Sequence, residues 1–228
     1  MSNNVLIVGA GNGLSASLAR IFNAQGYSIG LLARNTDKIQ TLAKEVSGKL
    51  FQCDVSNPSE VQKIFQEVDE NLGKLDLVIF NPSKRFKGAI EDLDVLEVKK
   101  SLDITCYAGF LVAQQAVIRM LKLGKGAIFF TGASASVKGF SNSSVFAMGK
   151  FGLRGLVQSL ARELHPKNIH IAHFIIDGII SKLPISKEKK LKDCLDPDEI
   201  AKSYLNFFLQ DRSCWSWELE LRPWLENF

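Results

Sequence analysis

Cysteine pairs, histidine clusters and long apolar runs are all missing from this chain of 228 residues. Its four cysteines are far apart and form no CxxC motif, and its three histidines lack the spacing of metal ligands. Reduced thiols and packing or surface histidines therefore fit the sequence better than a disulfide framework or a zinc site. No apolar run reaches the roughly 18 residues of a membrane span, and no basic-then-apolar leader precedes Val5. We expect a cytoplasmic protein without a membrane segment.

An excess of one charge is missing as well. The formal net charge is +4, and basic residues are interspersed with acidic ones, so no basic face typical of nucleic-acid binding stands out. The chain also has no internal repeat and no low-complexity tract. With 46% hydrophobic residues it is long enough for one sizeable core and too short for two comfortable domains. We expect one domain over residues 1–228.

Short apolar segments alternate with segments of helical periodicity along the chain. Because these segments are apolar on both faces, they predict a parallel sheet that is covered by helices on each side. The sequence therefore predicts a single α/β domain with a doubly wound sheet of about seven strands. The predicted strands are 5–8, 28–33, 50–53, 75–80, 127–131, 169–176 and an alternating segment at 215–221, and the longest predicted helices are 94–121 and 144–164.

A glycine-rich turn separates the first strand from the first helix. Glycines at such a turn let the backbone approach a pyrophosphate, whose charge then lies at the N-terminus of the helix. A bare turn is the alternative, but a strand before the motif and an amphipathic helix after it favour dinucleotide binding. The predicted cofactor residues here are Gly9, Gly11, Asn12, Gly13 and Leu14.

The end of the second strand indicates which dinucleotide is bound. Residues 32–35 contain no acid, which an NAD enzyme often places on the ribose hydroxyls, and Arg34 can instead accommodate a 2′-phosphate. The alternative is a solvated arginine at a strand end. We expect NADP(H) to be preferred over NAD(H).

Taken together, these motifs resemble the short-chain dehydrogenase/reductase family over nearly the whole chain. The family's TGxxxGxG pattern keeps Gly9 and Gly13 here but departs at Val8 and Ser15. The remaining matching segments are Cys53-Asp54-Val55 after the third strand, Phe80-Asn81-Pro82-Ser83 after the fourth, the spacing from Phe146 to Lys150, and Asp177-Gly178 after the sixth.

The resemblance implies a Rossmann-type fold and assigns further cofactor contacts. It implies that Asp54 and Val55 meet the adenine, that Asn81 flanks the adenine ribose, and that Lys150 holds the nicotinamide ribose. Gly178 is included as a further cofactor residue. For Asp54, the alternative is a helix cap before the next helix.

The family's catalytic set is serine, tyrosine and lysine, usually with an asparagine on the long central helix. The tyrosine transfers the proton, and the nearby lysine lowers its pKa. In this chain Lys150 remains, but the tyrosine position is Phe146, which has no titratable group. The serine position falls at Ala133, with Ser134 next to it, and the asparagine position falls at Thr105. Without the resemblance, Phe146 and Lys150 are an apolar helix face with one flanking charge; with it, we expect an intact pocket that lacks its acid.

Two hypotheses about function remain open. The first is an NADPH-dependent oxidoreductase that acts on a small carbonyl, an alcohol or an activated acceptor, with a water, Ser134 or Lys150 as the proton donor. The second is a catalytically silent dinucleotide-binding sensor or partner protein. We expect Tyr27 and Tyr204 to lie far from the site and Tyr107 to point away from it.

Substrate charge and assembly are further expectations. Lysines after the sixth strand, together with Lys84, Arg85 and Lys87, are compatible with a basic mouth that attracts a small anionic substrate, but a solvated face is the more common role of such a charge run. The resemblance implies a homodimer or homotetramer. The aromatic tail at 221–228 either joins that interface or folds back over its own chain. The lysines after the sixth strand are Lys182, Lys187, Lys189, Lys190 and Lys192.

Overall fold

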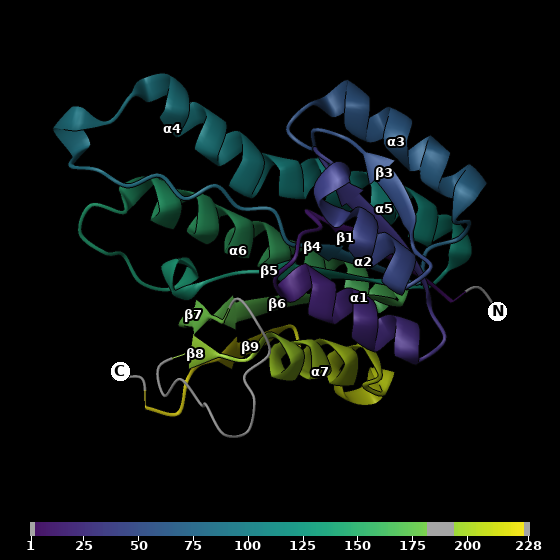
Figure 1. Cartoon of the computed structure of the whole chain (residues 1–228). Coiled ribbons are helices and arrows are strands. Elements are labelled where there is room, and N and C mark those ends of the chain that lie inside the picture. Colours follow the sequence, from purple (N-terminus) through teal and green to yellow (C-terminus); the bar gives the residue numbers. More distant parts are fainter. Residues whose placement is uncertain (1–2, 182–193, 226–228) are drawn as a thin grey trace.

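The computed structural model of this chain describes residues 3–181 and 194–225. Seven strands, all paired in parallel, form one sheet in the order β3-β2-β1-β4-β5-β6-β9 (Figure 1). This confirms the predicted doubly wound α/β fold. The strand order reverses between β1 and β4, which is where such sheets bind ligands at their carboxyl ends. The strands are β1 Asn4–Val8, β2 Ser28–Ala33, β3 Lys49–Gln52, β4 Leu77–Phe80, β5 Gly126–Thr131, β6 Ile169–Ile176 and β9 Glu218–Leu221.

Helices cover both faces of the sheet, as the apolar strands require. Three of them, α1, α2 and α7, pack on one face, and α3, α5 and α6 pack on the other, with α4 alongside α6 (Figure 1). Adjacent residues of a strand point to opposite faces of the sheet. Phe129 packs in the core under α1, α2 and α7, and Phe130 packs in the core under α3, α5 and α6. The helices are α1 Leu14–Ala24, α2 Gln40–Glu45, α3 Pro58–Asn71, α4 Val95–Leu102, α5 Ala108–Leu123, α6 Ser144–Leu164 and α7 Pro197–Phe208.

The long helix expected at 94–121 is interrupted. A π-helical turn at Asp103–Tyr107 joins α4 to α5, a feature that often marks functional sites. The whole run Val95–Leu123 is long and apolar enough to span a membrane by length and composition alone. Half of its apolar window is buried inside the fold, however, and α5 packs on β4 and β5. The α5 part of the run is therefore a core helix of this sheet.

The last strand is shorter than the alternating pattern predicts. It begins at Glu218, because Trp215 turns away to stack on His170 with 4.6 Å between the ring centroids. A two-residue parallel ladder, which the sequence does not predict, pairs β7 Ile179–Ile180 with β8 Cys194–Leu195. Both histidines of β6, His170 and His173, are buried, in agreement with packing roles.

Candidate functional site

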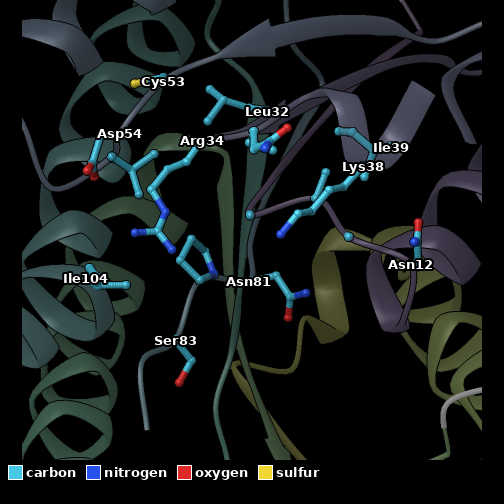
Figure 2. Close-up of a pocket in the computed structure, with 17 residues that line it drawn as sticks. Asn12, Leu32, Arg34, Lys38, Ile39, Cys53, Asp54, Asn81, Ser83 and Ile104 are labelled. Atoms are coloured by element: carbon cyan, nitrogen blue, oxygen red, sulfur yellow. The ribbon is translucent and has the colours of Figure 1, made fainter. Parts of the chain in front are cut away.

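A cavity of about 430 Å³ lies at the carboxyl ends of β1, β2, β3 and β4 (Figure 2). It is thus at the point where the strand order reverses. Gly13 and Leu14 follow its edge at the start of α1, whereas Lys150 and Gly178 lie outside it. The cofactor residues predicted from the sequence that line it are Gly9, Gly11, Asn12, Arg34, Asp54, Val55 and Asn81.

The glycine turn is tightly packed at Gly9 and open at Gly11 and Gly13. Gly9 has φ +77°, and a Cβ on it would lie 2.8 Å from Pro82, so only glycine fits. At Gly11 and Gly13 an added Cβ would meet nothing within 4 Å. The turn therefore leaves room for a group that needs close contact with the backbone.

The N-terminus of α1 has neither a side-chain cap nor an acid in its first turn. The helices α3, α4 and α7 differ, since each is capped by an acceptor side chain, namely Asn57, Asp94 or Asp196. The positive end of the α1 dipole is therefore not balanced by the chain itself. A negatively charged phosphate group fits this position electrostatically.

Ser15, at the position that the resemblance assigns to the family's last glycine, connects the glycine turn to the residue that follows β4. Its Oγ donates to the Gly9 carbonyl oxygen at 3.1 Å, and Asn81 Nδ2 donates to Ser15 Oγ at 2.7 Å. The predicted ribose-flanking residue Asn81 is thereby fixed in orientation. The sequence did not predict the bond between Asn81 and Ser15. Its one signal was the serine at position 15, where the family pattern has a glycine.

Two cations extend into the cavity from the end of β2. Arg34 and Lys38 both line it, and Figure 2 shows both side chains reaching into the same space. Lys38 arrives there because Asn35 Oδ1 accepts the backbone N–H of Asp37 at 2.9 Å and starts a short 3-10 turn. Sequence reasoning missed Lys38, although a second basic residue four positions after Arg34 was a visible signal.

Asp54, predicted to meet the adenine, lines the cavity. Its Oδ1 accepts hydrogen bonds from the backbone and the hydroxyl of Ser56, at 3.0 and 2.7 Å. Asn57, not Asp54, caps α3, so the alternative role for Asp54 as a helix cap is wrong. Burial works to raise the pKa of Asp54, but the bonds from Ser56 and the charge of Arg34 outweigh it and lower that pKa. The carboxylate is therefore ionised at neutral pH.

Lys150 is a buried amine on α6. Its Nζ donates to the Thr131 carbonyl oxygen at 2.7 Å and lies 5.9 Å from the centroid of the Phe146 ring. The helical spacing predicted that these two side chains share a face. Burial lowers the pKa of Lys150 to about 8, so the amine can gain or lose a proton near neutral pH.

Arg85 also reaches Phe146, which the sequence did not predict. The guanidinium carbon lies 5.3 Å from the ring centroid. The loop that carries it is held by Ser101 Oγ, which donates to the Lys84 carbonyl oxygen at 2.6 Å. Thr105, at the position that the resemblance assigns to the family's asparagine, accepts the Lys84 backbone N–H at 3.0 Å and so supports the same loop.

The segment after β5 presents Ser134 and buries Ser136. Ala133 N–H donates to Ser136 Oγ at 3.1 Å, and Ser136 Oγ lies 3.4 Å from His173 Nε2. His173 Nδ1 in turn lies 3.0 Å from a carboxylate oxygen of Glu218. Burial lowers the pKa of His173 to about 4, so the ring is neutral and serves as a packed structural bridge. Ser134, by contrast, is partly exposed.

The prediction that Tyr204 lies far from the site is wrong. Its hydroxyl is 2.8 Å from Oγ1 of Thr131, the same residue whose carbonyl oxygen accepts the hydrogen bond from Lys150. Tyr204 nevertheless belongs to the opposite face of the sheet and is fully buried, and burial raises its pKa. It is therefore not an exposed acid. Tyr107 is 44% exposed on the outer surface of the helices, as expected.

Gly178 lies against the C-terminal segment rather than in the cavity. A Cβ on Gly178 would be 2.8 Å from Pro223, and the neighbouring Asp177 pairs with Lys138 at 3.2 Å and Arg222 at 3.1 Å. The first part of the tail thus folds back on its own chain. The lysines predicted for a basic mouth at 182–192 lie outside the described residues.

A metal centre does not form within residues 3–181 and 194–225, where no three His, Cys, Asp or Glu side chains are grouped to hold an ion. Cys53 borders the cavity, but burial raises its pKa to about 12, so the thiol stays protonated.

Comparisons with known proteins agree with this geometry. A sequence model of the short chain dehydrogenase family matches residues 3–190. An uncharacterised oxidoreductase of Staphylococcus aureus is 25% identical over 224 residues, which are 96% of each chain.

Solved structures show the same fold. A short-chain dehydrogenase from Rhodopseudomonas palustris is 34% identical, with a TM-score of 0.85 over 97% of this chain and 98% of the other. A metagenomic short-chain oxidoreductase in complex with NADP is 21% identical, with a TM-score of 0.84 over 99% of both chains.

Proposed function

The chain belongs to the short-chain dehydrogenase family of oxidoreductases, and we propose that it binds NADPH and reduces a small carbonyl compound or an activated acceptor with a proton donor other than tyrosine. The observation that carries the proposal is the pair Arg34 and Lys38 at the cavity, opposite the open glycine turn. The 2′-phosphate is the group that distinguishes NADPH from NADH. Two cations at the end of β2 suit its charge.

The residues present fit a bound dinucleotide. The uncapped N-terminus of α1 suits the pyrophosphate, and Asn81, held by Ser15, suits the adenine ribose. A family relative of the same fold was solved with NADP, which supports the same cofactor here. When bound, NADPH supplies the hydride.

The proton has to come from the chain or from water. Phe146 has no hydroxyl, whereas Lys150, with its pKa lowered to about 8, is largely an ammonium at neutral pH. Ser134 and water are the other candidate donors. General acid catalysis contributes typically 10² to 10⁴-fold, so its weakening slows reduction of ordinary carbonyls more than that of activated acceptors.

A second candidate function is a dinucleotide-binding sensor without turnover. It is favoured by the side chains at three family positions, since Phe146, Ala133 and Thr105 offer neither the acid nor the usual polar partners. The bond from Lys150 to the Thr131 carbonyl would serve binding alone equally well.

Oxidation of NADPH by an acceptor distinguishes the reductase from the sensor. Purified protein is incubated with NADPH and a panel of quinones, imines, enones and aldehydes while the absorbance of the reduced nicotinamide is followed. We expect oxidation of NADPH with at least one activated acceptor, and a loss of that activity in Lys150→Met. If NADPH binds but is not oxidised by any acceptor, the sensor function is correct and the reductase is not.

We further propose that a second copy of the chain covers the apolar surface of α4, α5 and α6. Phe110, Met148 and Phe151 are large apolar residues that remain exposed there. A contiguous exposed apolar surface usually marks an interface. This surface of α4, α5 and α6 contains an apolar depression of about 420 Å³. The depression is lined by Leu102, Asp103, Cys106, Tyr107, Phe110, Met148 and Leu156.

A further inference from the structure

Two cations from different elements meet at the ring that replaces the family's acid. Arg85 comes from the loop after β4, with its guanidinium carbon 5.3 Å from the Phe146 centroid, and Lys150 lies on α6 at 5.9 Å from the same centroid. The ring carries no charge that could balance them. The surroundings of Phe146 are therefore positive.

The position of Arg85 is set by bonds on both sides of it. The Lys84 backbone N–H donates to Thr105 Oγ1 at 3.0 Å, and the Gly88 N–H donates to the Asn142 carbonyl oxygen at 3.1 Å. The first bond fixes the loop to the π-helical turn, and the second fixes it to the segment before α6. These bonds thus hold the two ends of the loop that carries Arg85, an exposed residue beside α6.

Two lysines near Arg85 are paired with carboxylates. Lys84 pairs with Glu97, and Lys138 pairs with Asp177. In the part of the chain that the structure describes, Arg85 forms no ion pair with a carboxylate. A guanidinium that stacks on an aromatic ring keeps its in-plane N–H groups available, and their geometry matches a carboxylate bidentately.

We propose that Arg85 determines substrate specificity by binding the carboxylate of an acidic carbonyl substrate over the Phe146 ring. The substrate class is then oxo acids and carboxylated aldehydes or enones rather than neutral carbonyl compounds. Phe146 contributes the apolar surface on which the guanidinium rests. This inference depends on the proposed reductase function for its kinetic test, but not for its binding test.

The kinetic test uses 4-formylbenzoate and its methyl ester, which share an aldehyde and differ in the carboxylate. We expect Arg85→Ala to lower kcat/KM for the acid by about ten- to a hundredfold, the range of a bidentate charge-assisted pair, and to leave the ester within about threefold. Arg85→Lys should fall between the two, because lysine cannot bind bidentately. Arg162→Ala, which removes an exposed arginine near the far end of α6, is the matched control and should change neither substrate.

The binding test measures benzoate on the protein saturated with NADPH by ligand-observed NMR. We expect Arg85→Ala to weaken benzoate binding by a similar factor and Arg162→Ala to leave it unchanged. Equal losses for acid and ester, or unchanged benzoate binding in Arg85→Ala, would overturn the proposal. If neither aldehyde is reduced while NADPH binds, the acceptor panel decides the reductase function separately, and the benzoate measurement alone decides the role of Arg85.

Discussion

The ammonium of Lys150 donates a hydrogen bond to the backbone carbonyl of Thr131 at 2.7 Å. This bond joins the helix that carries Phe146 to the end of β5, from the inside of the fold. The amine is thereby held at a fixed position next to a ring that cannot share its proton. Neither Phe146 nor the Thr131 carbonyl can donate a proton, so of these three groups Lys150 alone can supply one.

Cofactor preference is the first prediction. Arg34→Ala and Lys38→Ala should each weaken NADPH binding by about ten- to a hundredfold and leave NADH binding nearly unchanged, because only the 2′-phosphate pairs with these cations. Isothermal titration calorimetry with both dinucleotides measures this. Lys44→Ala, an exposed lysine on α2 outside the cavity, is the matched control. Equal affinity of the wild type for NADPH and NADH would contradict the assignment.

The regular elements were the predictable part of the fold. Ser28–Ala33, Ser144–Leu164 and Ile169–Ile176 agree with the predicted bounds, since apolar runs between turn residues report directly on buried strands and amphipathic helices. The π-helical turn at Asp103–Tyr107 was not predicted, because one extra residue in a turn hardly alters the apolar period.

The site was predictable only where it depends on local motifs. The glycine turn and Arg34 follow from their places in the sequence. Lys38 enters the cavity through a turn that Asn35 starts, and Arg85 reaches Phe146 across two elements. The contact between Arg85 and Phe146 depends on the packing of segments that are distant in the sequence, and the composition of a loop does not specify that packing.

Restoring the acid is the second prediction. Phe146→Tyr should raise reduction of ordinary aldehydes, by up to the 10² to 10⁴-fold that a general acid contributes, and Ala133→Ser beside it should raise it further. The new hydroxyl would be close to Arg85 and Lys150, whose charges lower the pKa of a phenol. Activity and a spectrophotometric titration of the tyrosine measure both effects.

Phe208→Tyr, on α7 at the opposite face of the sheet, is the matched control and should leave the rate unchanged. Variants that bind NADPH normally yet stay inactive on aldehydes would show that the inferred geometry around Phe146 is wrong. A wild type as fast as the variants would place the proton donor elsewhere.

Sensitivity to acid is the third prediction. Burial lowers the pKa of His170 and His173 to about 4 from an ordinary 6.5. Between these values the unfolded chain binds protons that the folded chain does not, so stability present above about pH 6.5 is lost as the pH falls toward 4. Each buried histidine contributes a loss on the order of 3 kcal/mol over that window. Urea unfolding at several pH values between 7 and 4 measures the slope.

His170→Phe keeps an aromatic ring between Trp215 and Phe207 and removes one titrating group. It should reduce the loss of stability between pH 6.5 and 4, although it also gives up the bond to the Ser216 carbonyl oxygen. A slope equal to that of the wild type would show that His170 does not stay neutral in the folded state.

Assembly is the fourth prediction. Light scattering should find at least a dimer, and Phe110→Arg should dissociate it, because a charge inside an apolar interface is desolvated without a partner. The tail is expected to have a divided role: Pro223 packs on Gly178 within the chain, whereas Trp224 is 80% exposed, and we expect it to contact a second copy. Removal of residues 224–228 should therefore weaken the dimer without abolishing it. A monomeric wild type would contradict the assembly, and a dimer unaffected by the truncation would confine the interface to the helices.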